Sequence, residues 1–404
     1  MTQHLVVVGG GQAAASFLAR FRKSDPDTAI TLVSAENHLP YQRPPLSKKY
    51  ATGDMKAEQL LLRPGEWYAE NHIDLKLGSD VQSIDLARST LALTNGDELP
   101  WSKMLLATGS RPRMLPANVG GDFHGVYCLR SITDADGFAA ELVEGRKVVI
   151  IGGGYIGLEA AAVCASKGLD VTLVEAADRI LQRVACPHTS RWFRKLHEDR
   201  GVRVLEGAML ERLEGDDGIV KAAILKDGTQ LDADFVLVGI GIVPNSELAA
   251  SAGLAVDGGI VVDANCRTSN PDIYAAGDCA VFQYKGELTR LESVQNAIDQ
   301  AECAASNLAG EALEYMPYPW FWSDQYDVKL QIAGLNRGYD EIVVREGGRE
   351  GSISHFYFSN GEFLAVDSMN DPRTYMVCKK LLESGRGLTS SQAVDTTLEL
   401  KSLV

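Results

Sequence analysis

The chain has 404 residues, 45% of them hydrophobic, so it can bury more than one core, and its length favours two or three domains. Its 39 basic and 54 acidic side chains give a net charge of -15, which argues against nucleic acid as a partner. No stretch approaches the ~20 consecutive apolar residues of a membrane span, and no basic region precedes the first apolar run. We therefore expect a cytoplasmic protein with no membrane contact.

Two segments repeat the order of apolar strand, glycine cluster, alanine-rich helix and second strand. In the first, strands at 5–8 and 30–33 enclose a helix over about 12–22. In the second, strands at 148–151 and 171–174 enclose a helix over about 156–167, which Gly168 ends. Continuous β-branched runs of this kind suit parallel strands that are covered on both faces, so both segments predict βαβ units.

Each half closes with an apolar strand that runs into glycine and proline, at 105–112 and at 237–244, which places domain borders there. Further on, 272–278 predicts another strand and 292–308 a helix that returns to the first domain. After Pro317 the pattern alternates, with strands at 328–333 and 355–358 and a helix near 374–383. The last segment is therefore expected to form an α+β domain.

A dinucleotide-binding fingerprint stands between strand and helix in both βαβ units. The first glycine permits a tight turn, the second lets the backbone approach a pyrophosphate, and the third small residue lets the helix pack on the strand. The fingerprint residues are Gly9, Gly11 and Ala14 in the first copy and Gly152, Gly154 and Gly157 in the second. The chain is thus expected to bind two dinucleotides. Plain glycine turns are the minority alternative.

An acid follows the second strand of each unit, Glu36 in the first and Glu175 in the second. At this place a carboxylate accepts hydrogen bonds from the ribose of adenosine, although both could also be exposed loop acids. Glu175 would repel a 2'-phosphate, and no arginine follows its strand until Arg179. The second site is therefore predicted to favour NADH over NADPH.

Six motifs together resemble the putidaredoxin reductase type of ferredoxin reductase, one of the glutathione-reductase-like flavoproteins. They include Pro44-Pro45-Leu46-Ser47-Lys48, the second glycine cluster through Glu159, Tyr274 to Asp278, and Trp320-Phe321-Trp322-Ser323-Asp324-Gln325. The resemblance spans nearly the whole chain. It implies an α/β fold with two Rossmann-like domains, for FAD (1–113 and 244–319) and for NAD (114–243), and a C-terminal α+β domain (320–404).

The resemblance also implies roles for individual residues. The FAD pyrophosphate would lie at 9–14, with Ala13 at the phosphate turn, and the adenosine ribose at Glu36, although some relatives carry this acid at the position of Ala35. Asp278 would bind the ribityl hydroxyls; read without the resemblance, it could equally be the N-cap of a helix before Ala280. The other residues implied to bind a cofactor are Lys48, Val81, Arg130, Val294 and Ile156.

Four residues are implied to act at the reaction site. Lys48 and Glu159 are expected to form an ion pair between the two dinucleotide domains, with the glutamate holding the nicotinamide carboxamide, whereas each alone would be read as a solvated charge. Tyr155 would cover the flavin and swing aside for the nicotinamide, and Trp322 would form a wall where the electron acceptor docks; aromatic rings at both places could also be core.

The implied activity is transfer of electrons from NADH through FAD to a [2Fe-2S] ferredoxin that serves a cytochrome-type monooxygenase or a ring-hydroxylating dioxygenase. FAD takes a hydride and can release single electrons, which an iron-sulfur centre requires. An acidic protein would dock this partner through a local basic patch, and the candidates are Lys48, Lys49, Arg290, Lys329 and Arg337.

Several alternatives stay open. A disulfide or peroxide reductase would need a close cysteine pair or a cysteine near the flavin, but the seven cysteines are scattered without C-x-x-C spacing, which also gives no support for a zinc site or disulfides. Rubredoxin reductase, the reductase of a dioxygenase and monodehydroascorbate reductase differ only in their acceptor. An NADH-sensing flavoprotein resembling apoptosis-inducing factor belongs to a different functional class.

Overall fold

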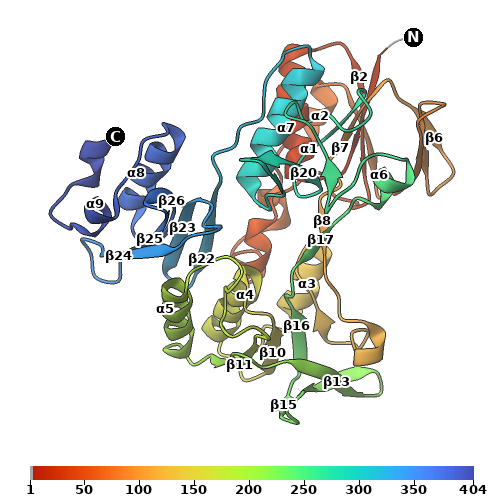
Figure 1. The fold of residues 1–404 in the computed structure, drawn as a ribbon. Helices are drawn as coiled ribbons and strands as arrows, with labels where there is room; N and C mark the ends of the chain where they lie inside the picture. The colour runs from red at the N-terminus through yellow and green to blue at the C-terminus, as the bar shows by residue number, and fades with distance from the viewer. Residues whose placement is uncertain (1–2) are drawn as a thin grey trace. The chain divides into compact units, whose positions relative to one another are not determined.

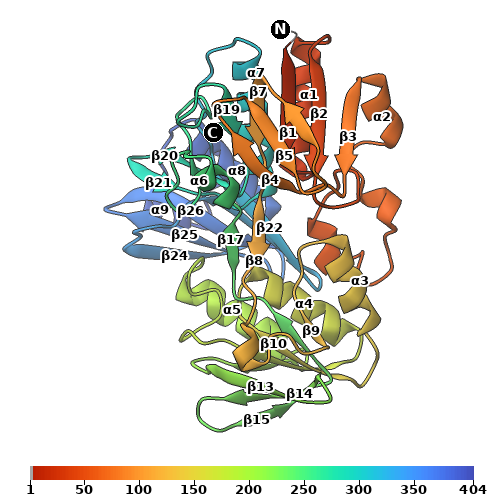
Figure 2. The same cartoon turned by 90° about the vertical axis from the view of Figure 1, so that its right-hand side faces the viewer.

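The computed structural model describes residues 3–404, which form two compact units (Figures 1 and 2). The first unit comprises the chain up to Arg43, Ala57–Arg111 and Ile242–Pro317. The second comprises Pro44–Lys56, Pro112–Gly241 and Tyr318–Val404. In the described range no helix is long and apolar enough to cross a membrane.

A five-stranded parallel sheet of order β19-β7-β1-β2-β3 forms the centre of the first unit. Its strands are β1 (His4–Val8), β2 (Ala29–Ser34), β3 (Ile73–Leu77), β7 (Lys103–Leu106) and β19 (Ile273–Ala275). Helices α1 (Gln12–Ser24) and α7 (Val294–Leu308) pack against each other. Because β1 pairs with β2 on one side and β7 on the other, the order of the strands reverses at β1, where such folds bind ligands.

Smaller elements complete the first unit. Its antiparallel sheet contains β4 (Val81–Asp85), β5 (Thr90–Leu93) and β6 (Glu98–Pro100), and a second small sheet contains β18 (Ile260–Val261), β20 (Ala280–Tyr284) and β21 (Glu287–Thr289). The short helices are α2 (Gly65–Glu70) and α6 (Glu247–Ser251). The two glycine- and proline-containing crossings form β8 (Ser110–Pro112) and β17 (Ile242–Pro244), which pair with each other.

The second unit repeats the parallel sheet, in the order β12-β11-β10-β16-β9. Its strands are β9 (Val126–Tyr127), β10 (Lys147–Ile151), β11 (Asp170–Val174), β12 (Arg203–Leu205) and β16 (Phe235–Val238). Its helices are α3 (Ile132–Ala140), α4 (Tyr155–Ser166) and α5 (Pro187–Glu198). An antiparallel sheet of β13 (Leu210–Asp216), β14 (Ile219–Leu225) and β15 (Gln230–Asp232) follows. The strand order again reverses, here at β10.

The C-terminal part of the second unit, blue in Figure 1, is an antiparallel sheet of order β22-β23-β26-β25-β24. Its elements are β22 (Trp320–Gln325), β23 (Val328–Gly334), β24 (Glu341–Glu346), β25 (Ile353–Ser359), β26 (Glu362–Met369), α8 (Pro372–Glu383) and α9 (Ser390–Val394). The predicted fold class and the predicted strands and helices are confirmed. The small three-stranded sheets are additions that the sequence analysis did not predict.

The C-terminal sheet has one apolar face and one face, called the polar face, that carries several buried polar side chains. Phe356, Phe358 and Val366 belong to a buried apolar cluster with residues of α8. The residues that alternate with them in the same strands include the buried polar side chains of His355 and Asp367. Because successive strand residues point to opposite faces, the polar face is turned away from α8 and contacts α5, where Thr189 bonds both His355 and Asp367.

Gly157 is where α4 packs most closely on the glycine turn. A Cβ atom there would lie 2.0 Å from the carbonyl oxygen of Gly152, which is backbone and cannot move aside. Gly157→Ala is therefore expected to lower the free energy of unfolding by about 2–3 kcal/mol, measured by urea denaturation. Gly154→Ala is the control, because a Cβ at Gly154 meets nothing within 4 Å. If Gly157→Ala and Gly154→Ala lowered the free energy of unfolding equally, the packing argument would be contradicted.

Candidate functional site

The glycine turn of the first unit leaves the start of α1 open. Gly9 has φ +115°, and a Cβ there would lie 2.1 Å from the carbonyl oxygen of Ala107, so only glycine fits. Gly11 is the N-cap of α1 and supplies no side-chain hydrogen bond, and a Cβ on it would meet nothing within 4 Å. The first turn of α1 thus presents backbone N–H groups without a side-chain cap beside open space, as a pyrophosphate requires.

The second unit has the same arrangement at the start of α4. Gly152 has φ +110°, and a Cβ there would lie 2.4 Å from the carbonyl oxygen of Gly239. Gly154 is an N-cap without a side-chain hydrogen bond, again beside open space. Ile156 lies in the first turn of α4 and is 42% exposed. Each unit therefore has its own place for a dinucleotide phosphate.

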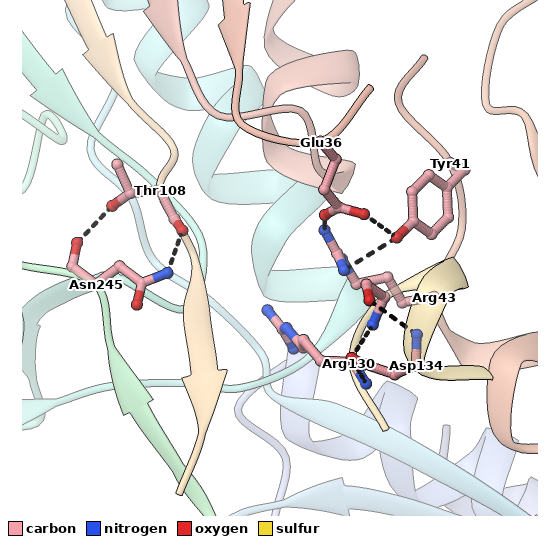
Figure 3. A network of polar contacts seen from close by, with 8 residues as sticks. Glu36, Tyr41, Arg43, Thr108, Arg130, Asp134 and Asn245 are labelled. Carbon is pink, nitrogen blue, oxygen red and sulfur yellow. Dashed lines mark hydrogen bonds and ion pairs between the residues drawn. The ribbon is translucent and has the colours of Figure 1, made fainter. Parts of the chain in front are cut away.

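Glu36 follows β2 and is held by two neighbours (Figure 3). Its carboxylate accepts hydrogen bonds from the hydroxyl of Tyr41 and from the guanidinium of Arg43. Burial alone would raise the pKa of Glu36, but the charge of Arg43 and these hydrogen bonds lower it overall. The carboxylate is thus fixed as an ionised acceptor, although part of its acceptor capacity is already used.

Glu175 follows β11 and lies against the second glycine turn. Its Oε2 accepts a hydrogen bond from the backbone N–H of Gly153 at 2.7 Å, and its Oε1 accepts one from Ala177 at 2.7 Å. A carboxylate offers about four acceptor positions, so two remain for the hydroxyls of a ribose. This placement agrees with the role expected of Glu175 without testing it.

Asp278 lies in the turn between β19 and β20, next to the start of α1. The hydroxyl of Ser110 donates to its Oδ2 at 2.8 Å. A Cβ on the preceding Gly277 would lie 3.2 Å from the Cβ of Ala13, which shows how close this turn is to α1. Ala280 begins a strand, so the alternative reading of Asp278 as a helix N-cap is wrong.

The remaining residues implied to bind FAD are divided between the units. Ala13 and Ala14 are buried in the first turn of α1, Val81 begins β4, and Val294 begins α7. Arg130 is half-buried in the second unit, just before α3.

The ion pair expected between Lys48 and Glu159 is present. Lys48 Nζ lies 2.7 Å from Glu159 Oε2, which also accepts a hydrogen bond from Ser47 Oγ at 2.8 Å. Ser323 Oγ donates to Glu159 Oε1 at 2.7 Å. Lys48 lies in the segment Pro44–Lys56, which the structure groups in the second unit together with Glu159.

This arrangement fixes the buried Glu159 carboxylate, whose side chain is 7% exposed. Three of its approximately four acceptor positions are filled, and one on Oε1 is left. An amide N–H of a nicotinamide carboxamide is a suitable donor for that position. Ser47 and Ser323 were missed by the sequence analysis as contacts of Glu159, although both lie inside motifs that carried the family resemblance.

Tyr155 is the first residue of α4. Its ring centroid lies 4.8 Å from that of Phe321, and its hydroxyl is buried without a hydrogen-bond partner within residues 3–404. Burial, and secondarily the negative charge of Asp367, raise the pKa of Tyr155 well above its usual value, so the hydroxyl stays protonated. A buried hydroxyl without a partner is unusual and fits a place that a ligand completes.

Trp322 is half-buried in β22 next to other rings. Its centroid lies 5.6 Å from that of Trp320 and 6.4 Å from that of Phe321. Because side chains alternate along a strand, Phe321, Ser323 and Gln325 share the face that contacts α4, and Trp320 and Trp322 share the other. Whether Trp322 adjoins a flavin stays a prediction.

The cysteines give one correction. Six of the seven are buried, as expected of small apolar residues. However, Cys266 and Cys303 lie next to each other, and the neighbouring Cys303 thiol, together with burial, raises the pKa of Cys266. The expectation that the chain offers no close cysteine pair is therefore wrong for these two. In the described chain no group of three or more His, Cys, Asp or Glu residues is placed to hold a metal ion.

Comparison with known proteins identifies the family. The model of the pyridine nucleotide-disulphide oxidoreductases matches residues 3–301, and that of the reductase C-terminal domain matches residues 320–404. The chain belongs to the pyridine nucleotide-disulphide oxidoreductase family. It is 42% identical to rhodocoxin reductase of Rhodococcus erythropolis over 98% of this chain and 93% of the relative, and 38% identical to putidaredoxin reductase of Pseudomonas putida over 99% and 96%.

A solved structure extends this similarity to the fold. The reductase in the covalent complex of putidaredoxin reductase with putidaredoxin matches with a TM-score of 0.96 and 38% identity, over 99% of this chain and 98% of that one. The predicted resemblance to this type of ferredoxin reductase is confirmed. Such oxidoreductases use FAD and NAD(H), and the two open glycine turns fit two dinucleotides.

The two open N-caps give a paired prediction for this oxidoreductase. A methyl group at Gly11 or Gly154 fits the protein itself but occupies the space that a pyrophosphate needs. Gly11→Ala is expected to reduce the FAD content of the purified protein, measured by absorbance. Gly154→Ala is expected to retain FAD and to raise the Kd for NADH roughly tenfold, or ~1.4 kcal/mol. If Gly11→Ala instead raised the Kd for NADH and Gly154→Ala lost FAD, the assignment of FAD to the first turn and NADH to the second would be contradicted.

His197 gives a prediction on stability against pH. It is fully buried in α5, and burial lowers its pKa to about 4, against 6.5 in an unfolded chain. Between these values the unfolded chain binds a proton that the folded protein does not, so the free energy of unfolding falls as pH falls from 6.5 toward 4. His197 is expected to account for up to ~3 kcal/mol of that loss.

His197→Gln removes this titration, so its urea unfolding should depend less on pH than that of the wild type between pH 7 and 4. His355 has the same pKa direction and Asp367 the opposite one, but both are common to the two proteins and cancel in the comparison. If the free energy of unfolding changed with pH in the same way in the wild type and in His197→Gln, His197 would not be held neutral in the folded protein.

Proposed function

We propose that this chain is an FAD-containing NADH:ferredoxin oxidoreductase that supplies single electrons to a [2Fe-2S] ferredoxin of an oxygenase system. The observation that carries the proposal is the pair of open glycine turns, one in each unit, together with the ion pair of Lys48 and Glu159. Relatives named as reductases of such systems, including the anthranilate 1,2-dioxygenase system, support it.

FAD, when bound, takes a hydride from NADH and gives electrons singly to an iron-sulfur centre. The chain itself binds and orients: in our proposal residues 1–113 and 244–319 hold FAD, residues 114–243 hold NADH, and residues 320–404 complete the site. Glu159 holds the carboxamide and thereby the face of the nicotinamide, and Lys48 keeps that carboxylate in place through their ion pair. No side-chain nucleophile is required.

Two features oppose the disulfide reductase alternative. Such an enzyme would carry a cysteine at about 40–50, where Tyr41 to Pro45 stand instead. Cys266 is fully buried and Cys303 9% exposed, so this pair is poorly placed to meet a disulfide substrate.

A reduced cytoplasm, where NADH is available, is the compartment that we propose.

The basic residues that were candidates for ferredoxin docking differ in their surroundings. Lys48 and Arg290 are half-buried, whereas Lys49, Lys329 and Arg337 are exposed. We therefore favour the exposed three for steering a negatively charged partner, since an exposed charge faces an approaching partner directly.

The direct test mixes the anaerobic yellow protein with NADH and then with acceptors. NADH should bleach the flavin band, and a [2Fe-2S] ferredoxin should restore it with multiple turnover. Raising the ionic strength from about 0.01 to 0.1 M shortens the Debye length from about 30 to 10 Å and should lower kcat/KM for the ferredoxin.

Ferricyanide is the control acceptor, because it takes electrons without specific docking. Turnover with ferricyanide and none with any ferredoxin would contradict the proposed partner. Slow reoxidation and a long-lived charge-transfer band would favour the NADH sensor. A colourless protein that FAD cannot reconstitute would contradict the whole proposal.

Glu175 gives the expected choice between nicotinamide cofactors. A 2'-phosphate would place negative charge beside this carboxylate, so kcat/KM should be higher for NADH than for NADPH. Glu175→Gln removes the charge while keeping a hydrogen-bond acceptor. It should lower the ratio of kcat/KM for NADH to kcat/KM for NADPH, chiefly by raising kcat/KM for NADPH. A wild-type preference for NADPH would refute this role of Glu175.

A further inference from the structure

A chain of buried hydrogen bonds continues from Glu159 into the C-terminal sheet and α5. Ser323 Oγ, which donates to Glu159, lies 3.2 Å from Gln325 Nε2. Gln325 Oε1 lies 2.9 Å from Nε2 of His197, and His197 Nδ1 lies 3.2 Å from the hydroxyl of Tyr326. Ser323, Gln325 and His197 are all 0% exposed, so water does not compete for these bonds.

The charge of Glu159 sets the direction of every bond in this chain. An ionised carboxylate only accepts, so Ser323 must donate its one hydrogen to Glu159 and accept from Gln325. Gln325 must then turn its amide nitrogen to Ser323 and its oxygen to His197. His197 consequently carries its hydrogen on Nε2, and Nδ1 accepts from Tyr326. No member can reverse without leaving a buried polar atom unpaired.

We infer that Gln325 and His197 are positioning residues for NADH: they hold Ser323 as a donor to Glu159 and so fix the acceptor position left for the carboxamide. The inference rests on the proposed function, since it assumes that Glu159 binds the nicotinamide. Neither residue touches the cofactor in this scheme; both act through the carboxylate.

A role in packing alone is the competing explanation, and the amide of Gln325 separates the two. A buried amide that merely filled space would be replaceable by an apolar side chain of similar volume with little loss of NADH binding. If the amide instead orders Ser323, its replacement frees the serine hydroxyl to rotate away from Glu159, and the carboxylate loses one of its three donors.

The test compares variants of the FAD-loaded enzyme with ferricyanide as acceptor. Gln325→Met is expected to raise KM for NADH about fivefold and to change kcat less than twofold, with FAD content unchanged. The same variant should raise the Kd for NAD⁺, measured by fluorescence titration without turnover. Ser354→Ala, which removes a buried hydroxyl that bonds Ser368 and Asp371, is the matched control and should leave both constants unchanged.

A double variant shows whether the effect passes through Glu159. Glu159→Gln alone should raise KM for NADH, and adding Gln325→Met should raise it no further, because the ordered carboxylate is already gone. The inference would be overturned if the increases in KM for NADH of the two single variants multiplied in the double variant. It would also be overturned if Gln325→Met had the KM and Kd of the wild type. Since ferricyanide needs no docking, failure with every ferredoxin would contradict the proposed function and not this comparison.

His197 provides a second, independent pair of variants. The amide of His197→Gln can still donate to Gln325, whereas His197→Met cannot, so KM for NADH should rise about threefold only in the methionine variant. Nitrogen-15 NMR of the histidine-labelled holoenzyme should show His197 with its hydrogen on Nε2. A hydrogen on Nδ1 would mean that the chain runs the other way, and would overturn the inference even if every variant lost stability.

Discussion

A buried negative charge is the constraint on which the second unit depends. Removing an ionised carboxylate from water costs several kcal/mol unless opposite charge and hydrogen bonds replace the lost solvent. For Glu159 these come from two separate places in the sequence, the segment with Ser47 and Lys48 and the strand with Ser323. The charge on α4 therefore specifies where both of the other segments must lie, and a single residue connects three parts of the chain.

The glycine turns impose a complementary constraint, because they keep space empty. Gly9 and Gly152 fit only as glycine, since their backbones pass within contact distance of a neighbouring strand end. Gly11 and Gly154 are different: the protein would accept a methyl group there, so their lack of a side chain serves no packing purpose. Residues that are dispensable for the fold but leave a helix N-terminus open are better explained by a bound phosphate than by stability.

The sequence predicted what depends on neighbouring residues. The βαβ units, both glycine turns and the helix predicted at 292–308 follow from local periodicity and turn chemistry, and the structure has them within one or two residues. The resemblance added the pair of Lys48 and Glu159. What could not be predicted joins distant residues: Cys266 and Cys303 are 37 positions apart, and His197 meets Gln325 only because the C-terminal sheet packs on α5. No local pattern encodes such contacts. The N-cap interpretation of Asp278 was wrong for a similar reason, because the residues around it did not reveal that Ala280 begins a strand.

The hydrogen bonding on the polar face of the C-terminal sheet differs between the part near Glu159 and the part near Tyr155. Toward Glu159 every polar group is paired, so moving the carboxylate would break several bonds at once. Toward Tyr155 the pairing is incomplete, since the Tyr155 hydroxyl and Asp367 Oδ1 both lack partners in the described structure. Rotation of the Tyr155 ring therefore sacrifices no hydrogen bond, whereas displacement of Glu159 does. A fixed acceptor beside a ring held only by packing is the combination expected where one group must orient a nicotinamide and the other must make way for it.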